Sequence, residues 1–186
     1  MAGHVCPWWL GYWLASPVRG WFSEKPEDLL APYIKEGMTV LEPGPGMGFF
    51  TLPLARLVGN SGCVIPIDIQ AKMLAGLARR AHHAGLDNRI KMRLARPDSM
   101  NLDDLNGTAD FALAFAVVHE MPSAGRFFRE AAAALKPGAL LFLAEPAGHV
   151  TAEKFQQELG AAQVAGLDEI NRPTVHRSRA AVLRKT

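Results

Sequence analysis

The sequence predicts an α/β fold, a doubly wound, seven-stranded, mostly parallel sheet with an antiparallel terminal strand. Short apolar runs of strand length alternate with longer segments of helical periodicity. Several of these runs are continuously apolar, as expected of parallel strands that helices cover on both faces. The last two strand-like segments are separated by too few residues for a parallel crossover, so we expect them to pair antiparallel.

The individual elements follow from this alternation. The first strand is expected over residues 39–42, and a run of glycines then leads into a helix over 49–58. Gly85 and Gly138 stand where helices should end, and Thr151 is suited to cap the start of the last helix. The remaining strands are expected over 64–68, 90–94, 111–115, 140–144, 168–172 and 178–184. The remaining helices are expected over 71–84, 124–135 and 152–165.

Size and composition favour a single domain. A chain of 186 residues with 49% apolar content can bury one sizeable core. We expect residues 25–186 to form this domain and residues 1–24 to form an aromatic N-terminal segment. The 20 basic and 18 acidic residues are nearly balanced, so no nucleic-acid partner is expected. The composition does not indicate an oligomeric state.

The cysteines and the apolar runs bear on the compartment. Cys6 and Cys63 are too few for a disulfide framework, which favours a reducing cytoplasm. No secretory signal is recognisable, and no apolar run is long enough to span a bilayer, so stable membrane insertion is not expected. His4 and Cys6 are metal-ligand types without a partner cluster, so no metal site is expected.

The stretch "LEPGPGMGFF", residues 41–50, places three glycines at alternate positions after the first expected strand. Glycine removes the Cβ that would block a ligand from approaching the backbone. A dinucleotide fingerprint requires G-x-G-x-x-G, but Phe49 occupies the position of its third glycine. No Gly-Lys-Ser or Gly-Lys-Thr follows, so the phosphate loop of nucleotide triphosphatases is also excluded.

Acidic residues surround this loop at informative positions. Glu42 stands just before the glycines, where a carboxylate favours a cation over a phosphate. Asp68 ends "VIPIDIQ", and Asp98 with Ser99 follows the third expected strand in "RLARPDSMNL". This order of motifs, from about residue 32 to 184, resembles that of the class I S-adenosylmethionine-dependent methyltransferases. The resemblance implies a Rossmann-like methyltransferase fold that binds S-adenosylmethionine.

The resemblance also implies the residues that hold the cofactor. Asp68 is expected to accept the ribose hydroxyls, and Asp98 to contact the adenine amino group. Pro43 and Pro45 lack an N–H, so the loop should be stiff and its donors restricted to the other positions. The expected cofactor-binding set is Glu42, Gly44, Gly46, Met47, Gly48, Asp68, Ile69, Asp98, Ser99 and Phe115.

Purely structural roles are the alternative for two of these carboxylates. Glu42 would then bind only the amides of its own loop. Asp68 would instead cap the helix that begins near Ala71.

His119 in "FAVVHEM" is the candidate general base, just beyond the fourth expected strand. Its ordinary pKa suits proton removal near neutral pH. The alternative is that His119 packs under the cofactor or binds a backbone carbonyl. Glu120 is a possible orienting partner, although adjacent residues usually point apart. No Asn-Pro-Pro-Tyr tetrapeptide is present, which disfavours the amino-group methylases of DNA and protein.

The N-terminal segment carries one aromatic face. Trp8, Trp9, Tyr12 and Trp13 recur at helical spacing, and such a face must be buried. Three locations are expected for this face: against the helices that flank the sheet, over the cofactor as a substrate lid, or on a membrane surface. We favour the lid, because the N-terminal helices of the resembled family lie over the cofactor.

The sequence therefore predicts an S-adenosylmethionine-dependent methyltransferase that acts on a small, partly apolar molecule by in-line displacement at the sulfonium methyl. A non-catalytic cofactor-binding or interaction module on the same fold is the first alternative. A nicotinamide-dependent oxidoreductase is the second alternative, and its glycine spacing is not matched here.

Overall fold

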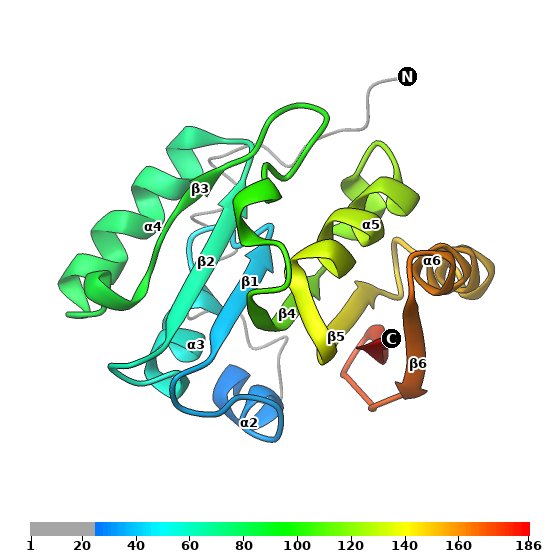
Figure 1. Cartoon of the computed structure of the whole chain (residues 1–186), viewed down its shortest axis with the longest axis horizontal. Helices are drawn as coiled ribbons and strands as arrows, with labels where there is room; N and C mark the ends of the chain where they lie inside the picture. Colours follow the sequence, from blue (N-terminus) through cyan, green and yellow to red (C-terminus); the bar gives the residue numbers. More distant parts are fainter. Residues whose placement is uncertain (1–24) are drawn as a thin grey trace.

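The computed structural model describes residues 25–186 (Figure 1). The predicted aromatic lid with Trp8, Trp9, Tyr12 and Trp13 lies outside the described residues. Helices span Pro26–Leu30 (α2), Thr51–Leu57 (α3), Ala71–His83 (α4), Ala124–Ala134 (α5) and Ala152–Val164 (α6). Strands span Thr39–Pro43 (β1), Cys63–Asp68 (β2), Arg93–Leu94 (β3), Ala109–Phe115 (β4), Leu135–Pro146 (β5), Leu167–Asn171 (β6) and Ser178–Lys185 (β7).

The seven strands form one sheet in the order β3-β2-β1-β4-β5-β7-β6 (Figure 1). β1 to β5 are parallel, whereas β7 runs antiparallel to both β5 and β6. The predicted doubly wound sheet and its antiparallel terminal pair are therefore confirmed. The strand order reverses between β1 and β4, which is the point where α/β sheets open a crevice at the carboxyl ends of their strands.

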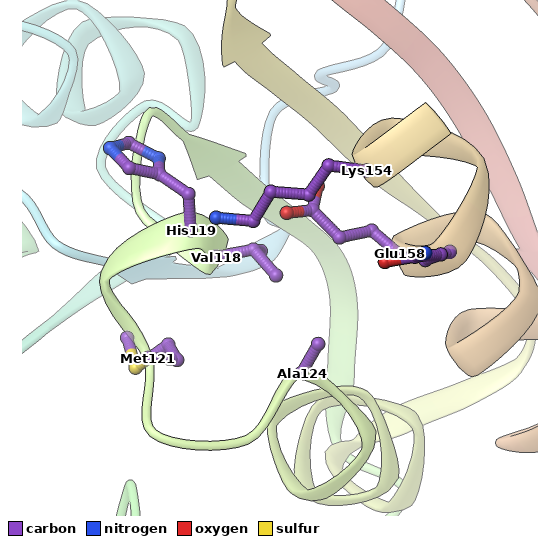
Figure 2. Close-up of a pocket in the computed structure, with 7 residues that line it drawn as sticks. Val118, His119, Met121, Ala124, Lys154 and Glu158 are labelled. Carbon is purple, nitrogen blue, oxygen red and sulfur yellow. The ribbon is translucent and has the colours of Figure 1, made fainter. Parts of the chain in front are cut away.

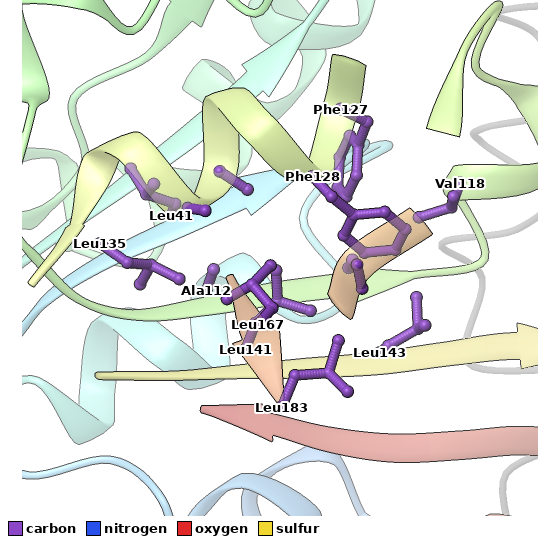
Figure 3. Packing of buried hydrophobic residues seen from close by; sticks show 14 of the residues in the cluster. Leu41, Ala112, Val118, Phe127, Phe128, Leu135, Leu141, Leu143, Leu167 and Leu183 are labelled. Carbon is purple, nitrogen blue, oxygen red and sulfur yellow. The ribbon is translucent and has the colours of Figure 1, made fainter. Parts of the chain in front are cut away.

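Residues alternate between the two faces of the sheet, and each face has its own core. Leu141 and Leu143 belong to the cluster under α5 and α6, together with Phe128 (Figure 3). Phe142, between these leucines, belongs to the opposite cluster, to which α2, α3 and α4 contribute. Because both faces are covered, residues 139–144 of β5 form a continuous apolar run. Each fully buried Leu or Phe contributes about 1.5–3 kcal/mol to folding.

The sequence placed most element boundaries within a few residues, with two exceptions at turns. The expected strand over 90–94 is reduced to Arg93–Leu94, because a 3₁₀ turn at Asp87–Arg89 precedes it and Ile90 makes only an isolated bridge to Val64. The prediction that Gly138 ends a helix is wrong. α5 ends at Ala134 and passes directly into β5, so Gly138 lies inside a strand.

The other predicted helix signals are confirmed. The Gly85 amide donates to the carbonyl oxygen of His82 just after α4, and Gly85 has a positive φ of 66°. Thr151 caps α6, and its hydroxyl accepts from the Lys154 amide at 3.2 Å. Within residues 25–186, no helix combines the length and hydropathy needed to cross a bilayer.

Candidate functional site

The glycine loop between β1 and α3 is shaped by both packing and backbone conformation. Gly44, Gly46 and Gly48 have positive φ values of 69°, 54° and 91°. A Cβ on Gly44 would lie 2.6 Å from the Val117 side chain, and one on Gly48 would lie 2.4 Å from Leu77. Packing alone therefore requires glycine at these two positions.

Gly46 differs, because its Cβ position faces open space. A Cβ built there would meet no atom of residues 25–186 within 4 Å. The amides of Gly44 and Gly48 donate to the carbonyl oxygens of Ile67 and Pro45, at 2.9 and 3.0 Å. Within the described chain, the amides of Gly46 and Met47 form no such bond. The loop thus offers an open cradle with two backbone donors.

Met47 presents its backbone to this cradle and its side chain to the protein. The side chain is buried against Gly76 of α4, and its carbonyl oxygen accepts from the Arg80 guanidinium at 2.9 Å. This anchorage to α4 holds the loop in place, in keeping with the stiff loop that its prolines predict.

Glu42 lies at the end of β1, 3% exposed. Burial raises the pKa of its carboxyl to about 8. Its Oε2 accepts no hydrogen bond from the described residues, and the buried hydroxyl of Thr51 also lacks a partner there. The alternative in which the loop amides satisfy Glu42 is therefore not seen at this oxygen. An unpaired buried carboxyl beside an open cradle suits a ligand that carries a cation or a hydrogen-bond donor.

Asp68 is the last residue of β2, the parallel neighbour of the strand β1 that carries Glu42. One carboxylate oxygen accepts from the Gln70 amide at 2.8 Å, and burial raises the pKa of Asp68 to about 6. Gln70, not Asp68, is the N-cap of α4, and no side chain caps that helix end. The helix-capping interpretation of Asp68 is therefore wrong.

Two apolar side chains flank the carboxylates at this edge of the sheet. Ile69 is 44% exposed directly after Asp68. Phe115, at the end of β4, packs on Phe50 with ring centroids 4.5 Å apart. Together they offer apolar surface of the kind that a nucleoside ring packs against.

Asp98 and Ser99 lie in a short turn after β3. The Asp98 carboxylate is 77% exposed and 3.9 Å from the Arg126 guanidinium, which also donates to the Asp98 carbonyl at 2.7 Å. The Ser99 hydroxyl binds the Glu130 carboxylate. These bonds fix the turn to α5, while the Asp98 carboxylate remains accessible at the edge of the crevice.

His119 lies in the short helical turn after β4 and is held by Glu145 at the end of β5. His119 Nδ1 forms a short hydrogen bond with Glu145 Oε2. Glu145 is fully buried, and its Oε1 accepts from the amides of Val117 and Val118 at 3.2 and 2.7 Å. Ala116, just before them, adopts a positive φ of 55°, which turns the chain at this point. The hydrogen bond to Glu145 raises the pKa of His119.

This arrangement changes the interpretation of His119 made from the sequence. Its ring binds a carboxylate, not a backbone carbonyl, and the orienting partner is Glu145 in place of Glu120. A carboxylate that fixes Nδ1–H leaves the other ring nitrogen as the proton acceptor. His119 therefore has the environment of a general base.

A pocket of about 220 Å³ opens beside His119 (Figure 2). Val118 and His119 lie across the pocket from α6, which contributes Lys154 and Glu158, and the His119 ring points away from that helix in Figure 2. The complete lining is Val118, His119, Met121, Ala124, Lys154, Gln157 and Glu158. The pocket thus combines an apolar wall with a few ionisable groups. No group of three or more potential metal ligands occurs within residues 25–186.

Residues 34–175 match a family model described as a methyltransferase domain. The chain belongs to this methyltransferase domain family. Its resemblance to the class I methyltransferases is thereby confirmed.

Relatives and solved structures agree with this family. A ubiquinone biosynthesis O-methyltransferase of Caulobacter vibrioides is 35% identical over 114 residues, which cover 61% of this chain and 42% of that protein. An arsenite methyltransferase of Aquipseudomonas alcaligenes is 33% identical over 121 residues, which cover 63% of this chain and 35% of that protein. The chain thus spans less than half the length of these two relatives.

A solved structure shares this fold. The crystal structure of a SAM-dependent methyltransferase from Aquifex aeolicus superposes with a TM-score of 0.86 at 24% identity, covering 98% of this chain and all of that one. The methyltransferase domain therefore has the architecture expected from the sequence.

Two carboxylates of the methyltransferase domain escaped the sequence analysis. Glu145 and Glu158 come from β5 and α6, and only the folded chain brings them to His119. A weak signal was present in each case. Glu145 directly follows the apolar run over residues 139–144 of β5, and Glu158 interrupts the inward-facing series Phe155, Leu159 and Ala162.

Proposed function

We propose that the protein transfers a methyl group from S-adenosylmethionine to a hydroxyl oxygen of a small, partly apolar acceptor. The observation that carries this proposal is the His119–Glu145 pair beside the pocket. Methyl transfer to a hydroxyl needs a base, because the acceptor is protonated at neutral pH. A pocket that pairs a base with an apolar wall suits such an acceptor.

The residues around the glycine loop fit the cofactor. The amides of Gly46 and Met47 and the Oε2 atom of Glu42 would hold its amino-acid part, since these three groups form no hydrogen bond within the described chain. Asp68 would accept its ribose hydroxyls, and Ile69 would pack against its ring. When bound, S-adenosylmethionine supplies an electrophilic methyl group on its sulfonium.

Asp98, Ser99 and Phe115 complete the proposed cofactor site. The exposed Asp98 carboxylate would accept from the adenine amino group at the edge of the crevice. Gly44 and Gly48 contribute through the loop conformation, because their own amides are already bonded within the protein. The aromatic residues of 1–24 stay a proposed lid over the acceptor.

His119 performs the proton transfer in this proposal. Glu145 holds Nδ1–H, so Nε2 takes the proton from the acceptor hydroxyl as its oxygen bonds to the methyl group. The buried position of Glu145 keeps the ring fixed and stabilises the imidazolium that forms. Orientation of the two reactants supplies much of the remaining acceleration, about 7–11 kcal/mol in favourable cases.

The names of the relatives support an oxygen acceptor. They include ubiquinone biosynthesis O-methyltransferases and a 27-O-demethylrifamycin SV methyltransferase. A ribosomal protein L11 methyltransferase and a 23S rRNA methyltransferase are also among them. A pocket of about 220 Å³ favours the small acceptor over a macromolecular one.

Formation of S-adenosylhomocysteine from S-adenosylmethionine and a panel of small hydroxylated molecules tests the proposal. His119→Gln should lower kcat by about 10²–10⁴-fold, the usual contribution of a general base, and leave cofactor affinity unchanged. His83→Gln, an exposed histidine at the end of α4, is the matched control. Full activity of His119→Gln would remove the base from the mechanism.

A further inference from the structure

Glu158 stands where the packing of α6 would place an apolar residue. It lies on the inward-facing side of that helix, one position before Leu159, and is 4% exposed. Its Oε2 accepts no hydrogen bond from residues 25–186. Burial, together with the charge of Glu145, raises the pKa of Glu158 to about 7. An unsatisfied buried carboxyl destabilises a fold, so its presence calls for a partner that residues 25–186 do not supply.

The carboxyl of Glu158 lines the same pocket as His119 (Figure 2). The polar side chains of the pocket include the His119 imidazole, which would receive the proton, and the Glu158 carboxyl on α6. Val118, Met121 and Ala124 contribute its apolar wall. An acceptor that occupies the pocket meets polar groups from both the turn after β4 and α6, with apolar groups beside them.

The charges in the pocket narrow the chemistry of the group that meets Glu158. Lys154, one helical turn before Glu158, lines the same pocket, and its positive charge opposes the rise in the pKa of His119 that the hydrogen bond to Glu145 causes. An ammonium on the acceptor would be attracted by Glu158 but repelled by Lys154. A carboxylate on the acceptor would be attracted by Lys154 but repelled by Glu145 and Glu158. A neutral hydroxyl avoids both penalties and donates a hydrogen bond to the unpartnered oxygen.

We propose that Glu158 determines acceptor specificity by binding a second hydroxyl group, so that the substrate is a small molecule with two hydroxyls on an apolar frame. One hydroxyl faces His119 and is methylated, and the other is anchored by Glu158. The volume suits a substituted single ring, because a cavity of roughly 150 Å³ holds benzene. This inference rests on the proposed function, since it takes the pocket as the acceptor site.

Binding of simple rings tests Glu158 without turnover. The probes are catechol, resorcinol and hydroquinone, each compared with phenol, which lacks the second hydroxyl. Their dissociation constants are measured by saturation-transfer NMR. Wild-type protein should bind at least one dihydroxybenzene about tenfold more tightly than phenol, the effect of one hydrogen bond to a carboxyl. Glu158→Leu should bring this preference within about threefold.

Two further variants make the result specific. Glu158→Gln retains an acceptor oxygen and should keep part of the preference, whereas Glu153→Gln, an exposed glutamate on the same helix, should keep all of it. Thermal melting of each variant checks that it folds. The proposal is overturned if wild-type protein binds no dihydroxybenzene at millimolar concentration, binds none better than phenol, or keeps its preference in Glu158→Leu.

Calorimetric titration with S-adenosylhomocysteine separates this proposal from the proposed function. If wild-type protein binds the dihydroxybenzenes through Glu158 but does not bind S-adenosylhomocysteine, the methyl-transfer function fails and the hydroxyl subsite stands. If S-adenosylhomocysteine binds and Glu158→Leu leaves the preference for the second hydroxyl unchanged, the function stands and the subsite fails.

Discussion

At the scale of a single residue, Glu42 is a buried carboxyl that we assign to the cofactor. Its carboxyl is buried beside the open cradle, and Oε2 has no partner in the described chain. Because burial disfavours the ionised form, the folded protein holds the proton of Glu42 more tightly than the unfolded chain does. A bound ammonium would reverse this preference, so cofactor binding should release a proton from Glu42.

The pH dependence of stability tests this account of Glu42. The pKa of its carboxyl rises from 4.5 to about 8 on folding, so its contribution to stability is fully present below 4.5 and is lost as the pH rises to about 8. Glu42→Gln should therefore lose less melting temperature than the wild type between about pH 5 and 8. Asp68 and Glu158, whose pKa values are also raised, are present in both proteins, so their effect on the melting temperature cancels in the comparison. Identical pH profiles would contradict the account.

The pair of His119 and Glu145 makes a second prediction at the residue scale. Glu145 raises the pKa of His119, and the base must be unprotonated to act, so activity should rise with pH through this raised value. Glu145→Gln should move the acid limb of the kcat/KM profile to lower pH and lower the plateau about ten- to hundredfold. The pH–rate profile measures both effects. An unmoved acid limb would mean that Glu145 does not control His119.

At the scale of an element, the β1–α3 loop combines positions fixed by packing with one left open for a ligand. The sequence predicted a loop of alternate glycines and prolines directly after the first strand. It did not predict that the individual glycines have different roles. Gly48 is required by Leu77 of α4 and Gly44 by Val117 beyond β4, contacts that arise only when distant segments meet.

The substitutions Gly46→Ala and Gly48→Ala should separate these roles. Gly48→Ala should lower the melting temperature strongly, because its Cβ would collide with Leu77. Gly46→Ala adds the strain of a positive φ, about 1–2 kcal/mol, without a clash. Its methyl enters the cradle, so it should weaken S-adenosylhomocysteine binding out of proportion to this loss. Thermal melting and calorimetry measure the two effects. The proposed difference between Gly46 and Gly48 would be contradicted if the two variants lost the same melting temperature and the same affinity for S-adenosylhomocysteine.

The sequence predicted element boundaries correctly where apolar periodicity determines them. The predictions failed where a turn determines the boundary. The sequence located β1, β2 and β4 because they are apolar runs bounded by turn residues. It misplaced the junction at Gly138, since Ala134 and Leu135 pass from helix to strand without a glycine stop. The C-terminal pair β6 and β7 was recognised from the length of the connection alone.

At the scale of the whole molecule, the topology followed from the sequence, whereas the acceptor site did not. Parallel strands with helical crossovers bring Glu42 and Asp68 to one edge, so the cofactor side could be inferred from strand ends. Glu145 and Glu158 join His119 only through the pairing of β4 with β5 and the packing of α5 and α6. Neither carboxylate belongs to a local motif, which is why the sequence analysis missed them.

The central claim is that the edge formed by β1, β2 and β4 is an S-adenosylmethionine site. Calorimetric titration of S-adenosylhomocysteine into the wild type and Asp68→Ala tests it most directly, with Asp168→Ala on the distant strand β6 as the control. Wild type and control should bind alike, and Asp68→Ala should lose roughly 1–3 kcal/mol of binding free energy. Absence of binding to the wild type, or equal affinity in Asp68→Ala, would contradict the account.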